Sequence, residues 1–127
     1  MTPFYLVSSI DGKVSFAWAD LEQVLRQTGK VLHWRPDTEL QWATTTMFSI
    51  VSVFRDEQIE IDVDDSLRVM TLMSKSDAAL EYALTLQQGY GREIFIFEGD
   101  NISGAIALSG VSGASDLRMR LSRPAVK

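Results

Sequence analysis

The pattern of apolar and polar positions is clearest between Gln58 and Asp64, where the two kinds of residue alternate strictly. Isoleucine or valine occupies every second position, and the positions between them are polar or acidic. Successive side chains of a β-strand point to opposite faces, so this period of two predicts a strand that is buried on one face. Its acids then line the exposed face about every 6 to 7 Å, which is twice the rise per residue of a strand.

Neighbouring patterns place this strand in a sheet. Apolar runs at Met47–Phe54 and Leu67–Met73 flank it and predict a three-stranded antiparallel meander with the acidic strand in the middle. At the start of the chain, Asp11-Gly12 separates the β-prone runs 4–10 and 13–17. Because Asp-Gly suits the tight turn of a hairpin, we expect these two runs to pair.

Further short strands are expected at residues 31–34, 93–98, 102–108 and 117–121. The last of these alternates leucine or methionine with arginine, which favours an edge strand with its arginines outward. The sequence therefore predicts about six to eight strands.

Two segments have helical periodicity. The first covers about residues 21–28, with Asp20 as its N-cap and Gly29 at its end. The second covers about residues 77–88 and begins after Ser76, a favourable capping residue. Neither helix belongs to a repeating βαβ array, so the predicted class is α+β with a mainly antiparallel sheet.

Length and composition fit one globular domain spanning residues 1–127, with 46% hydrophobic and 23% charged residues. The absence of cysteine excludes disulfides and thiolate metal sites. The N-terminus lacks the basic region and apolar core of a signal peptide, and no apolar run is long enough to span a membrane. We therefore expect a cytoplasmic protein without a membrane partner.

The formal net charge of −5 is distributed unevenly. Residues 118–127 hold four bases and no acid, which leaves eight of the 12 bases against all 17 acids in residues 1–117, a formal charge of −9. Such a body repels phosphate backbones, so nucleic acid is not an expected partner. A basic protein is attracted and its association is accelerated. Acidity that serves only solubility is the simpler alternative.

Little in the sequence indicates catalysis or metal binding. The single histidine, His33, lies in an apolar run, where a structural role is more common than a catalytic one, and no G-x-S-x-G motif accompanies it. Asp62, Asp64 and Asp65 offer carboxylates to a hard cation, but the glycine of a calcium-binding loop is missing. We expect no enzymatic activity, no cofactor and no metal.

Three tryptophans, Trp18, Trp34 and Trp42, lie close together in the sequence near several acids. Most tryptophans belong to a protein core, but an exposed tryptophan beside carboxylates is typical of a binding hot spot. Trp34, Trp42 and the neighbouring Arg35 are therefore candidate contact residues.

The second half of the chain resembles the small acidic immunity proteins that bacteria encode beside polymorphic or contact-delivered (type VI secretion-like) toxins. The likeness covers about residues 55–108: an acidic strand pair, the helical segment Ser76 to Leu84, the strand segment Arg92 to Phe97 and a short hairpin strand. It implies a non-enzymatic cytoplasmic inhibitor that presents carboxylates to the basic residues of a cognate toxin. The basic segment 118–127 departs from this pattern.

Three hypotheses remain open. The first is a module that binds and neutralises a basic toxin, with the partner-binding residues Glu57, Glu60, Asp62, Asp64, Trp34, Trp42 and Arg35. The second is a small-ligand-binding or enzymatic domain with a pocket near His33 and Trp34. The third is a structural module that forms a homodimer through exposed strand edges.

Overall fold

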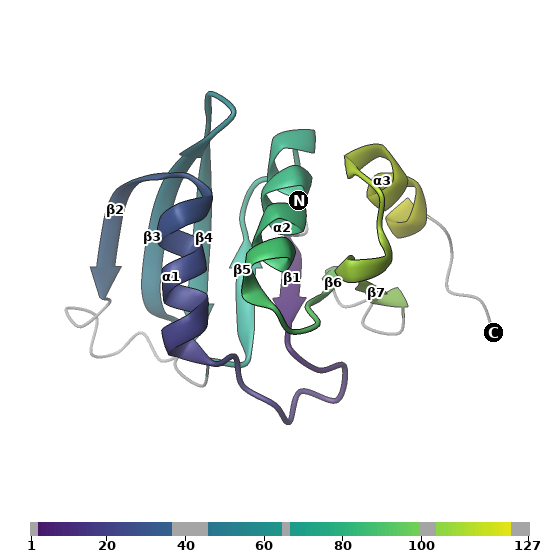
Figure 1. Ribbon diagram of the computed structural model, residues 1–127, viewed down its shortest axis with the longest axis horizontal. Coiled ribbons are helices and arrows are strands. Elements are labelled where there is room, and N and C mark those ends of the chain that lie inside the picture. Colours follow the sequence, from purple (N-terminus) through teal and green to yellow (C-terminus); the bar gives the residue numbers. More distant parts are fainter. Residues whose placement is uncertain (1–2, 37–45, 65–66, 100–103, 123–127) are drawn as a thin grey trace.

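The computed structural model describes residues 3–36, 46–64, 67–99 and 104–122. These residues form a seven-stranded sheet with helices on one side of it (Figure 1). The strands are β1 (Phe4–Val7), β2 (Lys30–Pro36), β3 (Thr46–Phe54), β4 (Glu57–Asp64), β5 (Val69–Leu72), β6 (Phe95–Glu98) and β7 (Ile106–Ala107). The helices are α1 (Trp18–Thr28), α2 (Asp77–Tyr90) and α3 (Ala114–Ser122), and a short 3₁₀ helix, η2 (Leu108–Gly110), precedes α3.

All strand pairings are antiparallel, and the strand order is β2-β3-β4-β5-β1-β6-β7. Strands β3, β4 and β5 form the predicted meander, which is confirmed together with the α+β class. The first strand of the chain, β1, does not pair with its neighbours in sequence but lies between β5 and β6. The interior of the sheet therefore depends on pairing between β1, at the start of the chain, and two strands that are distant from it in sequence.

The core lies between the sheet and the helices. Paired residues form two buried rows across the sheet: Ile50, Ile61, Leu72 and Phe4 in one, and Val63, Met70, Leu6 and Ile96 in the other. Each of these side chains is at most 3% exposed. Burying one side chain of this size contributes about 1.5 to 3 kcal/mol, so these rows are a major source of stability.

Helix α2 is the central helix and contacts both α1 and α3 (Figure 1). The Oγ of Ser76 accepts a hydrogen bond from the Ala79 N–H at 3.2 Å, as predicted for its N-cap. The helix continues two residues beyond its predicted end and stops at Gly91, which has the left-handed φ of 78° that favours glycine there. Gly89 lies inside the helix, where a Cβ would lie 3.0 Å from Val24 of α1.

Helix α1 begins at Trp18, earlier than predicted, and Asp20 is not its N-cap. Ala17 is the capping residue and has no side-chain hydrogen bond. Its N–H instead donates to the hydroxyl of Tyr90 at 2.7 Å, and the ring of Phe16 packs edge-on against Tyr90. A contact with the distant end of α2 therefore fixes the start of α1, while Asp20 lies in the first turn, where its charge is favourable.

The predicted hairpin at the start of the chain is wrong. Residues 13–17 form no strand, and β1 pairs with β5 and β6 instead. The carboxylate of Asp11 accepts hydrogen bonds from the Ser9 hydroxyl at 2.8 Å and from the Lys13 N–H at 3.0 Å. These bonds form a local turn, and the residues that follow it leave the sheet.

The predicted edge strand at residues 117–121 is also wrong, because these residues belong to α3. Leu117 is fully buried, while Met119 is 56% exposed, so the two do not share a face. The partly buried Ala114 and Leu121 lie three and four residues from Leu117, a spacing that fits one face of a helix. The predicted strand at 102–108 is shorter, since β7 covers Ile106–Ala107 and residues 100–103 lie outside the described part of the chain.

Gly29 follows α1 at a point where two backbones come close. Its backbone is extended, with φ of −143°, so the reason for glycine is space and not conformation. A Cβ at this position would lie 2.8 Å from the carbonyl oxygen of Val53 and would collide with the hydroxyl of Ser52. Ser52 is itself fully buried and has little room to move.

We expect Gly29→Ala to lower the free energy of unfolding by about 1 to 3 kcal/mol, because the added methyl group overpacks this contact. Urea denaturation followed by circular dichroism measures the change. Gly110→Ala is the matched control, since no atom lies within 4 Å of its Cβ position. We expect the control to stay within about 0.5 kcal/mol of the wild type. Equal stability of the two variants would refute this account of Gly29.

Candidate partner-binding face

Strand β4 is buried on its helix-facing side and open on the other. Ile59 and Ile61 have no exposed surface, whereas Gln58 and Glu60 are exposed. The predicted one-sided strand is confirmed. Helices α1, α2 and α3 all lie on the same side of the sheet, and no described helix or strand covers the other side (Figure 1). We call this uncovered side the open face.

Two of the predicted acids, Glu60 and Asp62, lie on the open face in the middle of β4. Glu60 is paired in register with Val51 of β3 and forms no ion pair with a described residue. Asp62 is partly exposed and lies between Ser49 of β3 and Thr71 of β5. The exposed carboxylate of Glu60 is therefore solvated and accessible to a partner's cation.

Asp64 lies at the end of the same side of β4 and holds the turn to β5. Its Oδ1 accepts hydrogen bonds from the backbone N–H groups of Arg68 and Val69, each at 3.0 Å. Within this turn Leu67 adopts a φ of 59°, which is uncommon for such a residue. Asp64 thus adds negative charge to the open face while its carboxylate also supports the turn.

Glu57 does not join the other three acids. It shares the side of β4 that carries Ile59, and its Oε2 accepts hydrogen bonds from the hydroxyls of Ser74, at 2.8 Å, and Ser76. Because Ser76 caps α2, Glu57 links the start of β4 to the beginning of that helix. The strict alternation of the strand already places residue 57 on the same side as Ile59, so the sequence contained this signal.

Two ion pairs join the same end of α2 to other elements. Lys75 pairs with Glu98 of β6. Arg118 of α3 pairs with Asp77 at 2.8 Å and also donates to the carbonyl of Lys75 at 2.8 Å. Arg118 therefore attaches α3 to α2, which gives part of the basic segment a role inside the fold.

Helix α3 has a further internal ion pair. The carboxylate of Asp116 accepts hydrogen bonds from the Ser112 N–H at 3.1 Å and from the Arg120 Nε at 3.0 Å. The Ser112 N–H, followed by Arg120, holds the pKa of Asp116 below its usual range. Arg120, like Arg118, already has an acidic partner within this chain.

Two candidate positions of strand β2, His33 and Arg35, lie in the same cross-strand rows as Glu60 and Asp62. His33 pairs with Val51, which pairs in turn with Glu60, and Arg35 pairs with Ser49, which pairs with Asp62. Trp34 pairs with Ile50, a position of the buried row. Trp42 lies outside the described residues.

On its other side the acidic strand borders an apolar part of the open face. Thr71 lies beside Asp62, Tyr5 lies beside Thr71, and Phe97 lies beside Tyr5. The rings of Tyr5 and Phe97 are 5.4 Å apart between centroids. The adjacent row consists of Val69, Val7 and Phe95. Val7 and Phe97 are buried within the chain, whereas Tyr5, Val69 and Phe95 are partly exposed.

Sequence reasoning did not select these apolar face residues. The run from Phe4 to Val7 is apolar at every position, so its sequence does not show which residues face away from the helices. What the sequence does not contain locally is the position of β1 beside β5, which brings Tyr5 next to Thr71. The open face thus has an acidic strip on β4 beside partly buried apolar residues of β5, β1 and β6.

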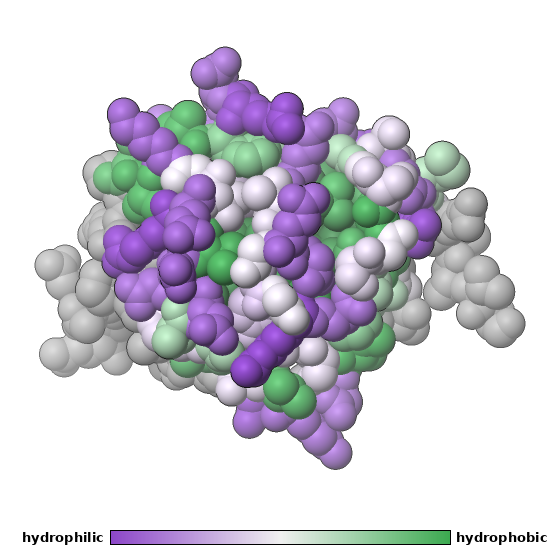
Figure 2. Space-filling model, viewed as in Figure 1, coloured by the Kyte–Doolittle hydropathy of each residue, from purple (hydrophilic) through white to green (hydrophobic). Residues whose placement is uncertain are grey.

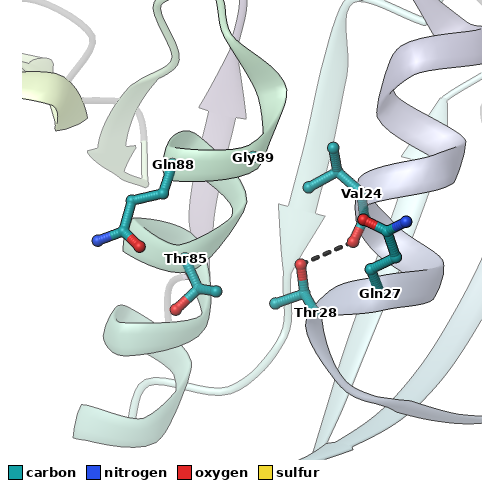
Figure 3. Close-up of a pocket in the computed structure, with 6 residues that line it drawn as sticks. All are labelled: Val24, Gln27, Thr28, Thr85, Gln88 and Gly89. Carbon is teal, nitrogen blue, oxygen red and sulfur yellow. Dashed lines mark hydrogen bonds between the residues drawn. The ribbon is translucent and has the colours of Figure 1, made fainter.

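A separate hollow of about 280 Å³ lies between α1 and α2, lined by Val24, Gln27, Thr28, Thr85, Gln88 and Gly89 (Figure 3). The Thr28 hydroxyl donates to the carbonyl of Val24 at 2.7 Å, and the Thr85 hydroxyl donates to the carbonyl of Glu81. None of the lining side chains titrates, so the hollow offers no general acid or base.

Two hydroxyl groups are buried in the core beneath the helices, those of Ser52 and Tyr82. Neither has a hydrogen-bond partner among the described residues, and the ring of Tyr82 packs edge-on against Phe54 at 5.5 Å. Burial raises the pKa of the Tyr82 phenol above its usual range. Tyr82 therefore stays neutral and acts as a core residue.

Across the described ranges, no three histidine, aspartate or glutamate side chains gather in a way that could hold a metal ion. Within the same ranges no helix combines the length and the apolar character needed to cross a bilayer. The helix side of the molecule has hydrophilic residues with smaller hydrophobic areas between them (Figure 2).

Comparison of the chain with models of protein families, with curated proteins and with solved structures finds no match in any of the three. The α+β architecture and the composition of the open face therefore rest on this chain alone.

The contact between Glu57 and Ser76 is expected to stabilise the fold. Glu57→Ala removes the acceptor for two hydroxyl groups, and Ser76→Ala removes the helix cap, so each should cost about 1 kcal/mol in the free energy of unfolding. In a double-mutant cycle the double variant should lose less than the sum of the single losses, by about 0.5 kcal/mol or more. Glu60→Ala is the control and should change stability by less than about 0.5 kcal/mol. Strictly additive losses would show that the two side chains do not act together.

Proposed function

We propose that this protein is a non-enzymatic binding module that neutralises a basic protein partner on its open face, and that this partner is a polymorphic or contact-delivered toxin. The observation that carries the proposal is the position of Glu60 and Asp62 on the side of the sheet that no described helix covers. Glu60 is exposed there, and Asp62 is partly exposed.

Electrostatics supports a basic partner. The formal charge of −9 on residues 1–117 attracts cations over a distance of about 8 to 10 Å at physiological salt. Glu60 has no ion pair among the described residues, so a cation on the partner gains a contact without breaking one. Toxins that act on nucleic acids or nucleotides need basic residues for the phosphates, and covering those residues with carboxylates blocks their action.

The choice of a toxin among basic proteins comes from the resemblance of residues 55–108 to small acidic immunity proteins. In that reading the protein acts in the cytoplasm of the cell that makes the toxin. It binds the toxin and has no chemistry of its own.

The two other hypotheses have less support. The hollow between α1 and α2 has no titratable group in its lining, so this hollow offers a catalytic reaction no acid or base. Pairing of strand edges is hindered at both ends of the sheet: β2 has a register shift between Val31 and His33 and ends in Pro36, and β7 has two residues. At the β7 edge a homodimer therefore has the backbone of two residues to use.

The proposal predicts that charge reversal on the open face weakens toxin binding. The probe is the product of the reading frame next to this gene, purified and titrated by calorimetry with the wild type and with the double variant Glu60→Lys, Asp62→Lys. We expect a loss of affinity of at least about 30-fold, because the toxin's cations then face like charges.

The matched control is Asp20→Lys with Glu22→Lys on α1, which changes the net charge by the same amount on the helix side. Long-range attraction changes equally in both double variants, so we expect the control to slow association while keeping the short-range contacts. In cells that express the toxin, the control should restore growth and the open-face variant should not. Unchanged affinity after reversal of Glu60 and Asp62 would remove the open face as the binding site.

A further inference from the structure

We infer that the open face binds an arginine side chain of the partner, with its aliphatic part against Met73 and its guanidinium on the carboxylate of Glu60. This inference rests on the proposed function and names the side chain of the basic partner that the face recognises. It uses Glu60 alone among the acids of β4, because Asp62 and Asp64 already interact with other residues of this chain.

Met73 lies on the open face directly beside Glu60. Its backbone N–H donates to the carbonyl of Glu60 at 3.0 Å, which continues the antiparallel register of β4 and β5 by one pair. Leu72 is buried beneath the helices, and Ser74 donates to Glu57 on the helix-facing side at 2.8 Å. Because side chains alternate along an extended chain, Met73 is directed to the opposite side, where it is 44% exposed.

The carboxylate of Glu60 stands between two apolar side chains. On β3 its cross-strand neighbour is Val51, which is partly exposed, and on the other side its neighbour is Met73. Opposite residues of an antiparallel pair have Cβ atoms about 4.5 to 5.5 Å apart, so one long side chain lying on Glu60 can contact both apolar groups. Glu60 forms no ion pair with a described residue. This short row therefore has one unpaired charge at its centre.

Met73 differs from the other large apolar side chains that are exposed in the described part of the chain. Ile10 and Val14 lie in the loop after β1, beside an aspartate whose carboxylate is held by hydrogen bonds within that loop. Leu32 lies in the register shift of β2, and Met119 lies on α3 between two arginines that have acidic partners. Among these residues, Met73 is the one whose cross-strand neighbour is an unpaired acid.

The surroundings of Glu60 favour arginine over lysine. A guanidinium is planar and weakly hydrated, so it can lie against apolar atoms while it donates two parallel hydrogen bonds to one carboxylate. The ammonium of lysine is a compact, strongly hydrated charge, and the apolar neighbours would remove part of its water without replacing it. Both side chains have an aliphatic part that packs on apolar surface, but only the guanidinium also packs with its charged end.

Apolar and acidic side chains fit this position less well. An apolar group over Met73 would remove water from the carboxylate of Glu60 and return no hydrogen bond, which is unfavourable. An acidic group would meet a like charge. Arginine replaces the lost water with charged hydrogen bonds and covers Met73 at the same time, so both residues contribute to one contact.

The first test needs no partner protein. Isotope-labelled methionine methyl groups are followed by NMR while N-acetylarginine amide is added up to about 100 mM at constant ionic strength, because a single exposed contact is weak. We expect the methyl signal of Met73 to shift at least about three times as far as that of Met119, which is also exposed. The neutral N-acetylcitrulline amide should leave the Met73 signal in place, and Glu60→Gln should abolish the response to arginine.

Equal shifts of the two methyl signals would overturn the inference, because the probe would then have no preferred place on the molecule. An equal response of Met73 to N-acetyllysine amide would overturn the choice of arginine. A response that persists in Glu60→Gln would show that the carboxylate does not hold the probe.

The second test uses calorimetry with the product of the reading frame next to this gene. We expect Glu60→Gln to weaken binding by at least about tenfold and Met73→Ala by at least about fivefold. The double variant should lose less than the product of the two factors, since one side chain of the partner contacts both residues. Met119→Ala and Asp20→Asn, which remove an exposed methionine and an exposed acid from α3 and α1, are the matched controls and should stay within about twofold of the wild type.

The two tests separate this inference from the proposed function. If reversal of Glu60 and Asp62 abolishes toxin binding while Met73→Ala leaves it unchanged, the arginine site is refuted and the proposed function stands. Losses that multiply strictly in the double variant also refute the shared contact. If the arginine probe selects Met73 but the neighbouring gene's product does not bind, the site stands and the proposed function fails.

Discussion

One-sided packing of the sheet constrains every strand of this protein. Because α1, α2 and α3 lie on the same side, each strand must direct its apolar positions toward them and can leave the alternate positions to water. From Gln58 to Asp64 this division is complete: Ile59, Ile61 and Val63 have no exposed surface, and Glu60, Asp62 and Asp64 take the other side. A shift of this strand by one residue would turn its carboxylates toward the helices and its isoleucines toward water. The alternation of apolar and acidic residues therefore fixes the register of the strand.

The same constraint explains why Glu57 needs partners and Glu60 does not. Glu57 stands on the helix-facing side, where an unpaired carboxylate is costly, and the hydroxyls of Ser74 and Ser76 satisfy it. This contact, the pair of Lys75 with Glu98 and the tether from Arg118 all meet at the beginning of α2. That helix end therefore joins β4, β6 and α3, which are far apart in the sequence.

Local patterns predicted those parts of the fold that local interactions determine. The meander around β4 and the capped start of α2 at Ser76 were predicted because strand alternation and capping act between near neighbours. The position of β1 and the helical state of residues 117–121 depend on contacts with distant elements, and both predictions were wrong. For the site, the sequence indicated Glu60 and Asp62 but grouped Glu57 with them, and it could not indicate Tyr5 or Thr71 without the strand order.

The two parts of the open face have different physical consequences for recognition. Covering Tyr5 and Phe95 releases water from apolar surface and favours any apolar partner of suitable shape. The same covering removes water from Glu60, and an exposed carboxylate that loses its hydration without gaining a cation costs several kcal/mol. The strand order places the acidic strand two positions from β1, so covering both parts of the open face combines the two effects.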